Sequence, residues 1–250
     1  MSSYQTFASV YDLFMDNVPY DEWCELYADI LKEYGITEGI MLDLGCGTGA
    51  MTRRFAKKGF DLIGVDASAE MLDMARESEE KDILYLQQDM RSFELYGTVA
   101  AVVSVCDSMN YILEEEDLLQ VFKLVNNYLD PGGLFVFDMT TPYQYETVLG
   151  ENSFCESRDE AAFLWENFFD KESRINEYDL TLFVRDEKEQ TERYRRFVET
   201  HYQRAWSPDE VKSLLQKSGL ELLGIFGEDG RKPLEDSDER MYFVARECMK

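Results

Sequence analysis

Hydrophobic positions in the first 140 residues fall into short apolar runs, separated by stretches whose apolar residues recur at helical spacing. Short apolar runs bounded by turn signals are typical of strands in a buried sheet. Strands that alternate with helices predict a parallel sheet with right-handed crossovers. The five predicted strands are Ile40–Leu44, Leu62–Val65, Ile83–Leu86, Val99–Val105 and Leu134–Phe137.

Two of the intervening stretches show a clear helical stripe. The stretch Ala69–Arg76 has apolar residues on one face, and Asp117–Leu129 carries a longer stripe that includes Leu118, Val121 and Val125. Apolar residues at this spacing predict amphipathic helices. The turn residues 130–133, Asp-Pro-Gly-Gly, are predicted to stop the second helix and turn the chain into the fifth strand.

The pattern changes after residue 140. Three segments, Phe163–Phe169, Ile175–Arg185 and Glu192–Arg204, are rich in aromatic and β-branched residues and nearly alternate between apolar and polar positions. Polar links separate them, so they predict an antiparallel meander inserted into the α/β fold. In the third segment, alternation places Phe197, Glu199 and His201 on one face.

The α/β pattern resumes near residue 207. Ser207-Pro208-Asp209-Glu210 combines an N-cap serine, a proline at the first helical position and a glutamate three residues on, which predicts a helix start. Gly219 is expected to end that helix, and Leu220–Phe226 and Met241–Ala245 are predicted as two strands antiparallel to each other. The expected organisation is a helical N-terminal cap (1–37), an α/β core of seven strands with helices on both faces (38–140 and 205–250), and an inserted β subdomain (141–204).

Charge and composition narrow the partners. Lys and Arg number 25 against 51 Asp and Glu, so the formal net charge is −26. The negative electrostatic field of this charge opposes nucleic-acid binding, and no run of basic residues overcomes that field locally. Its first residues lack the basic start and apolar run typical of a signal peptide, no apolar stretch is long enough to span a bilayer, and its five cysteines form no C-x-x-C pair. We therefore expect a cytoplasmic protein with no membrane partner.

Glycine or acidic residues follow four of the predicted strands. Gly45, Gly47 and Gly49 lie in the loop after the first strand, where they allow a ligand to approach the main chain. Asp66 ends the second strand, Asp89-Met90 follows the third, and Cys106-Asp107 follows the fourth. Open α/β sheets bind ligands at the carboxyl ends of their strands, so these residues predict one binding site.

The run Leu42-Asp43-Leu44-Gly45-Cys46-Gly47-Thr48-Gly49, with Gly64-Val65-Asp66-Ala67-Ser68 and Met71-Leu72, resembles the class I S-adenosylmethionine-dependent methyltransferases of the small-molecule type. The resemblance covers residues 38–140 by motif and 205–246 by topology, and it implies a Rossmann-like fold. It also implies S-adenosylmethionine as cofactor and S-adenosylhomocysteine as product.

The resemblance assigns a role to each matching residue. It implies that the glycine loop lies by the methionine moiety, that Asp66 holds the ribose, and that Asp43 orients the loop or reaches the amino group. The implied cofactor-binding residues are Tyr11, Asp43, Gly45, Cys46, Gly47, Gly49, Asp66, Ala67, Met71, Asp89, Met90 and Cys106. Tyr11, and with it Tyr4, belongs to an N-terminal segment that resembles a lid; packing of this segment on the core is the alternative.

The expected reaction is methyl transfer to a small-molecule nitrogen or oxygen by in-line displacement, in which the protein chiefly aligns the reactants. A cofactor-binding protein without catalysis is one alternative. An NAD-dependent oxidoreductase is another, because Ala50 completes a loose G-x-G-x-x-A fingerprint. No metal site is expected, since no His/Cys cluster has ligand spacing.

The catalytic residue stays unassigned. The candidates are Asp107, Tyr111 and His201, the only histidine in the chain. For His201 the sequence favours a surface position on a strand over a place above the active site. The meander is interpreted as a substrate cover or as a homodimer interface. The aromatic residues Trp165, Phe168, Phe169 and Tyr178 are candidates for lining a pocket beneath it.

Overall fold

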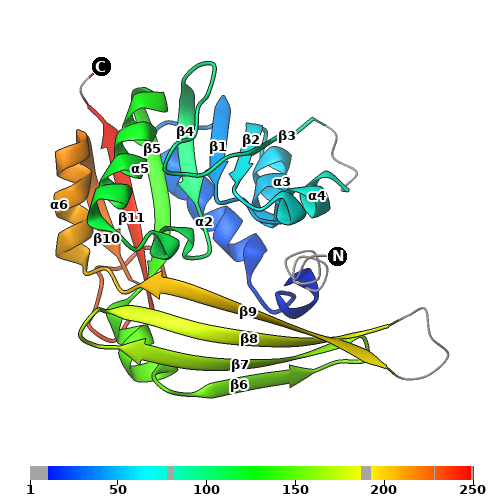
Figure 1. Cartoon of the computed structure of the whole chain (residues 1–250). Coiled ribbons are helices and arrows are strands. Elements are labelled where there is room, and N and C mark those ends of the chain that lie inside the picture. Colours follow the sequence, from blue (N-terminus) through cyan, green and yellow to red (C-terminus); the bar gives the residue numbers. More distant parts are fainter. Residues whose placement is uncertain (1–10, 78–81, 187–192, 228, 249) are drawn as a thin grey trace.

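A computed structural model describes residues 11–77, 82–186, 193–227, 229–248 and 250. Its strands form two sheets, one of seven strands and one of four. The four-stranded sheet lies across one end of the seven-stranded sheet (Figure 1). Within the described residues, no helix is long and apolar enough to cross a membrane.

The seven-stranded sheet has the order β10-β11-β5-β4-β1-β2-β3. Strands β1 to β5 pair in parallel, whereas β11 runs antiparallel to both β5 and β10, as the sequence predicted for the last two strands. Its strands are β1 (Ile40–Leu44), β2 (Asp61–Asp66), β3 (Leu84–Gln87), β4 (Val99–Ser104), β5 (Leu129–Thr140), β10 (Leu220–Phe226) and β11 (Arg240–Glu247).

Helices cover both faces of this sheet, as predicted, because the central strands bury apolar side chains on both sides. On one face, α5 (Glu115–Tyr128) and α6 (Pro208–Ser218) pack in one core cluster with Phe135 and Phe137. On the other face, α2 (Tyr20–Glu33) and α3 (Ala50–Lys57) pack in a second cluster. The short helix α4 (Ala69–Arg76) packs beside β3.

The turn signals act close to where the sequence placed them. Helix α5 ends at Tyr128, and β5 begins directly at Leu129, so Asp130–Gly133 forms an irregularity in the strand and not a separate turn before it. Ser207 and Glu210 form the predicted capping box, and Gly219 ends α6 with a φ of 89°.

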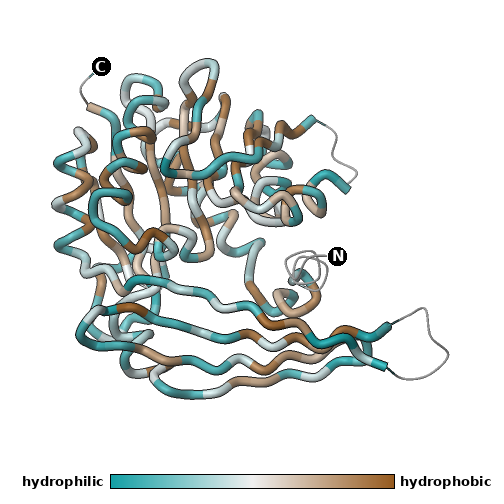
Figure 2. Tube along the Cα trace, in the orientation of Figure 1, coloured by the Kyte–Doolittle hydropathy of each residue, from teal (hydrophilic) through white to brown (hydrophobic). Residues whose placement is uncertain are grey.

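The four-stranded sheet has the order β6-β7-β8-β9 and is antiparallel throughout. Its strands are β6 (Ser153–Ser157), β7 (Ala161–Asp170), β8 (Ile175–Arg185) and β9 (Tyr194–Arg204). The sequence predicted β7, β8 and β9 but missed β6, a five-residue edge strand. The predicted start of the third segment, Glu192, lies outside the described residues. Hydrophobic and hydrophilic residues mix along these strands (Figure 2).

Asn110 joins the two ends of the segment that carries the second sheet. Its side-chain amide donates to the carbonyl oxygens of Thr140 (3.3 Å) and Arg204 (2.9 Å), and its Oδ1 accepts from the Thr140 amide at 3.0 Å. Asn110 is fully buried in the short 3-10 helix η1 (Ser108–Tyr111), which follows β4. The start and end of the segment are therefore fixed at the carboxyl edge of the central sheet.

Candidate active site

A cavity of about 1260 Å³ lies between the carboxyl ends of the central strands and the inner face of the second sheet. Ligand pockets commonly measure about 300–1,000 Å³, so this cavity has room for more than one small ligand. Of the twelve residues predicted to bind the cofactor, eleven line it: Tyr11, Asp43, Gly45, Cys46, Gly47, Asp66, Ala67, Met71, Asp89, Met90 and Cys106. The predicted lid residue Tyr4 lies outside the described residues.

Gly49 is the exception, since it does not line the cavity. It has a φ of 76° at the N-cap of α3, and a Cβ there would lie 2.4 Å from the Tyr85 hydroxyl oxygen. Gly49 therefore serves the turn into α3 and its packing against Tyr85, which a G-x-G-x-G pattern alone does not distinguish from ligand contact.

Gly45 and Gly47 shape the cavity wall. Gly45 has a φ of 82°, and a Cβ there would lie 2.7 Å from Ser108 Oγ; Gly47 has a φ of 53° and open space where a Cβ would stand. The Gly47 amide donates to Asp66 Oδ2 at 2.8 Å, and the Ser68 amide donates to Asp66 Oδ1 at 2.9 Å. Burial raises the pKa of Asp66, and the bonds from these amides oppose that rise.

Asp43 lies beneath this loop. It is 1% exposed and accepts a hydrogen bond from the Thr52 hydroxyl at 2.6 Å. Burial raises the pKa of Asp43 to about 7, because water no longer stabilises the carboxylate. A cationic group bound in the cavity would favour the ionised form of this carboxyl.

Asp89 lines the cavity but already has a cationic partner. Arg91 Nε lies 2.9 Å from Asp89 Oδ1 and Arg91 Nη2 lies 2.6 Å from Oδ2, and the Arg91 amide also donates to Oδ1 at 2.8 Å. The Arg91 guanidinium holds the pKa of Asp89 below its ordinary value. Any ligand amine that reached this carboxylate would share it with Arg91.

The loop after β4 has an unusual backbone. Cys106 and Asp107 have φ values of 62° and 51°, in the left-handed region that non-glycine residues rarely occupy. Two hydrogen bonds hold them there: their amides donate to the two carboxylate oxygens of Asp138, each at 3.0 Å. Tyr27 also donates to Asp138 at 2.8 Å.

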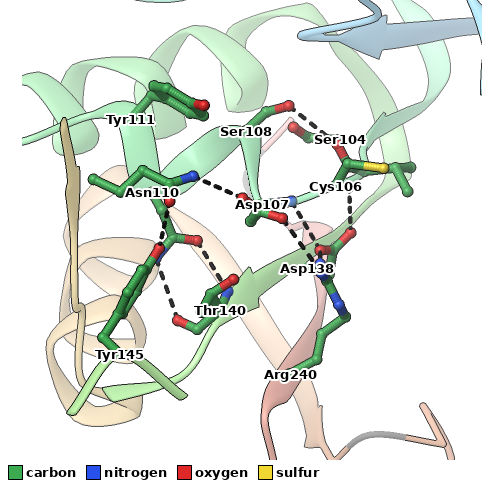
Figure 3. A network of polar contacts seen from close by, with 12 residues as sticks. Ser104, Cys106, Asp107, Ser108, Asn110, Tyr111, Asp138, Thr140, Tyr145 and Arg240 are labelled. Atoms are coloured by element: carbon green, nitrogen blue, oxygen red, sulfur yellow. Dashed lines mark hydrogen bonds and ion pairs between the residues drawn. The ribbon is translucent and has the colours of Figure 1, made fainter. Parts of the chain in front are cut away.

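Arg240 completes this network, which is shown in Figure 3. Its guanidinium pairs with Asp138 and with Asp107, the latter at 3.3 Å. The sequence interpretation missed both Asp138 and Arg240. Asp138 lies at the end of β5 and Arg240 at the start of β11, so strand-end position was the only available signal.

All three catalytic candidates line the cavity. Asp107 does not cap the turn that follows it; its carboxylate accepts from Gln203 Nε2 at 2.7 Å. The Tyr111 hydroxyl lies 2.6 Å from the Tyr178 hydroxyl and 3.5 Å from His201 Nδ1. The preference for His201 as a surface residue is wrong: its side chain is 10% exposed and stacks on Tyr178, with ring centroids 4.8 Å apart.

The aromatic residues of the second sheet divide between its two faces. Trp165 and Tyr178 line the cavity as expected. Trp165 Nε1 is buried and has no hydrogen-bond partner among the described residues. The other two expectations are wrong. Phe168 is 52% exposed because it lies on the outer face, and Phe169 lies outside the cavity wall and stacks on Tyr145.

The cavity fits a nucleoside carrying an amino acid. Carboxylates stand at three strand ends, and the space that a Cβ would fill at Gly47 leaves the main chain open to a ligand. Within the described ranges, no group of three or more His, Cys, Asp or Glu side chains could hold a metal ion.

Several known proteins are similar to this chain. A family model described as a methyltransferase domain matches residues 41–133. The chain is 35% identical to YqeM of Bacillus subtilis, whose name describes it as a methyltransferase, over 97% of this chain and 96% of YqeM. An S-adenosylmethionine-dependent methyltransferase from Clostridium acetobutylicum has the same fold, with a TM-score of 0.87 and 30% identity over 99% of this chain and 100% of that one.

A third relative has a more specific name. An N,N-dimethyltransferase from Streptomyces venezuelae, named for dTDP-3-amino-3,4,6-trideoxy-alpha-D-glucopyranose, is 34% identical over 52% of this chain and 56% of its own length. Since the similarity to the first two proteins spans nearly the whole chain, the protein belongs to the S-adenosylmethionine-dependent methyltransferases.

Proposed function

We propose that the protein methylates an amine nitrogen of a small molecule that binds beneath the second sheet. The charge of the cavity wall carries this proposal. Eight carboxylates line the cavity: Asp43, Asp66, Glu70, Asp89, Asp107, Glu114, Asp117 and Glu156. The two arginines that line it, Arg91 and Arg240, each pair with two carboxylates. A wall of this charge favours a cationic or amine-bearing acceptor.

The cofactor end of the cavity is proposed to follow the family. Asp66 would hold the ribose hydroxyls, Ala67, Met71, Asp89 and Met90 would surround the adenine, and the loop at Gly45 would contact the methionine moiety. S-adenosylmethionine supplies, when bound, a methyl group already activated by its sulfonium. The chain's own residues therefore align the acceptor and exclude water.

The Streptomyces venezuelae relative supports a nitrogen acceptor, since its name describes methylation of an amino sugar. A nucleotide-linked acceptor fits this chain less well. A pyrophosphate needs cationic partners, and both arginines of the cavity wall are already neutralised by carboxylates. We therefore propose a free amine or amino sugar as acceptor.

The second sheet is proposed as the substrate cover, because its inner face lines the cavity through Trp165, Tyr178 and His201. Its outer face exposes Phe168 and Tyr202, so the homodimer stays a prediction that light scattering on the full chain would test. A cofactor-binding protein without catalysis needs no acceptor space, whereas this cavity provides it.

Calorimetric titration with S-adenosylhomocysteine tests the cofactor end. Radiolabelled S-adenosylmethionine, offered with a panel of amino sugars and aliphatic amines and with their hydroxyl analogues, tests the acceptor. We expect label in the amines and none in the matched hydroxyl compounds. Binding of S-adenosylhomocysteine with label only in hydroxyl compounds would contradict the nitrogen acceptor, and binding with no label anywhere would favour the non-catalytic alternative.

A further inference from the structure

Four side chains form a polar cluster on the acceptor side of the cavity. His201 and Glu199 come from β9, Tyr178 from β8 and Tyr111 from η1. His201 Nε2 lies 3.4 Å from Glu199 Oε2, and His201 Nδ1 lies 3.5 Å from the Tyr111 hydroxyl. The imidazole therefore stands between a carboxylate on one side and the cavity on the other.

Glu199 is the unusual member of the cluster. Its side chain is 3% exposed, and neither carboxylate oxygen has a hydrogen-bond partner among the residues that the structure describes. A buried carboxylate without a donor is costly unless a cation stands beside it. The imidazole of His201 is the group paired with this carboxylate, and a proton on its Nε2 supplies an N–H beside Glu199.

The other candidates for a base are weaker. The Asp107 carboxylate is already engaged, because it pairs with Arg240 and accepts a hydrogen bond from Gln203 Nε2. Tyr178 is a poor base because burial raises its pKa well above the ordinary value and keeps the phenol neutral. His201 is the only histidine in the chain.

We propose that His201 is the catalytic base that accepts the proton of the acceptor amine, and that Glu199 is the positioning residue that fixes its ring. This inference rests on the proposed function. With its proton on Nε2, 3.4 Å from Glu199 Oε2, the ring keeps a lone pair on Nδ1, which lies 3.5 Å from the Tyr111 hydroxyl at the cavity wall.

The ammonium form of the acceptor has no lone pair, so one N–H proton moves to His201 Nδ1, directly or through the Tyr111 hydroxyl. The neutral nitrogen then forms a C–N bond to the methyl carbon while the C–S bond breaks and its electron pair stays on sulfur. The product is a methylated ammonium ion, and His201 later releases its proton to water.

Several titratable groups surround His201 and affect this transfer. Glu199 flanks it on β9, Tyr178 stacks on it from β8, and Tyr111 faces it from η1. Gln203, two residues along β9, links Asp107 to the Tyr145 hydroxyl and so connects the next pair of titratable groups. Glu199, and not Asp107, is the carboxylate paired with the imidazole itself, so replacing Glu199 should alter His201 directly.

The test uses the full chain, in which the single histidine gives one set of ring signals in carbon–proton NMR spectra. We expect the ring carbon shifts of Glu199→Gln to show a smaller share of the Nε2-protonated tautomer than the wild type, because the ring loses the carboxylate beside Nε2. Glu166→Gln is the matched control: Glu166 is an exposed carboxylate on the outer face of β7, and its removal should leave the tautomer balance of His201 unchanged.

The second measurement is methyl transfer to the amine panel as a function of pH. His201→Asn should lower kcat by on the order of 10²–10⁴-fold and remove the rise of kcat with pH. The affinity for S-adenosylhomocysteine and the melting temperature of this variant should match the wild type. Glu199→Asp should recover part of the activity that Glu199→Gln loses, which a merely structural carboxylate would not require.

Two results would overturn the proposal about His201: a His201→Asn variant with wild-type kcat and pH profile, or a Glu199→Gln variant whose histidine keeps the wild-type tautomer balance. His201→Gln is the second variant if His201→Asn does not fold. If wild-type protein binds S-adenosylhomocysteine but methylates no amine, the proposed function fails first, and the role of His201 toward an amine fails with it.

Discussion

The two sheets bury their strands in different ways. Strand β4 has five fully buried residues out of six, and all but three of the residues of β5 are buried, so both faces of these strands are packed. In β9, Glu199 and Gln203 are buried while Thr200 and Tyr202 between them are exposed. Packing therefore constrains the residues on both faces of the central strands. Residues on the inner face of the second sheet, in contrast, can be substituted without disturbing a core that the two sheets share.

This contrast separates the two ends of the cavity. The cofactor end is built from loops whose positions the packed central sheet determines, and the acceptor end is built from side chains on a one-sided sheet. Substitutions at the cofactor end should therefore affect folding and cofactor affinity together. Substitutions on the second sheet should affect the acceptor alone.

The largest effect is expected for Asp138→Asn. The change removes the buried counter-charge of Arg240 and weakens the bonds that hold Cys106 and Asp107, so the free energy of unfolding should fall by about 3–5 kcal/mol. Denaturant unfolding would measure this loss of stability, and calorimetry with S-adenosylhomocysteine would measure the accompanying loss of cofactor affinity. Asp179→Asn, which replaces a half-buried carboxylate on the second sheet by a side chain that can still accept from Thr200, is the control and should cost under about 1 kcal/mol.

Gly45→Ala should weaken S-adenosylhomocysteine binding by about 10- to 100-fold, because the φ of 82° is strained for alanine and its Cβ would meet Ser108. Gly59→Ala is matched to it. Gly59 has a φ of 99° but lies outside the cavity wall with no atom near its Cβ position, so that variant should lose stability and keep its affinity. Equal loss of affinity in both variants would show that strain, and not position, governs binding.

Trp165→Phe should raise the KM of the amine acceptor by about tenfold and leave the affinity for S-adenosylhomocysteine unchanged. The variant keeps an aromatic ring but removes the Nε1 donor, which finds no partner within the described part of the chain. Steady-state kinetics with calorimetry would measure the two effects. Phe168→Leu, on the outer face of the same strand, should change neither; a weaker cofactor affinity in Trp165→Phe would contradict the division of the cavity.

The smallest effect is a pH dependence of stability that arises from Asp43. Its pKa of about 7 in the folded protein exceeds the ordinary value of 3.8, so the folded state binds more protons between these two values. The contribution of Asp43 to stability is complete below about pH 4 and is lost as the pH rises through 7. Between pH 6 and 8 this should cost about 1 kcal/mol, and Asp43→Asn should remove that part of the slope in denaturant unfolding.

How much of this molecule could be predicted from the sequence depends on how local each signal is. The glycine loop and Asp66 follow apolar runs directly, so the pattern located both, and the capping box at Ser207 was predicted for the same reason. Gly49 shows the limit of a local motif, because only the contact with Tyr85 reveals what that glycine does.

The rest depends on contacts between distant segments. Asp138 and Arg240 are separated by 102 positions, and nothing near either residue indicates that they meet. The cluster around His201 has the same origin, since Tyr111 and His201 lie 90 positions apart. Edge strand β6 was missed because five residues with little burial carry a weak periodic signal.

Asn110 has a consequence beyond its hydrogen bonds. By bonding Thr140 and Arg204 at once, it brings the first and last residues of a 65-residue excursion, counted from 140 to 204, to one point on the central sheet. A segment whose ends already meet can be exchanged for another of different length at little cost in loop-closure free energy. Chimaeras cut at these two residues would thus join the acceptor preference of one family member to the cofactor site of another.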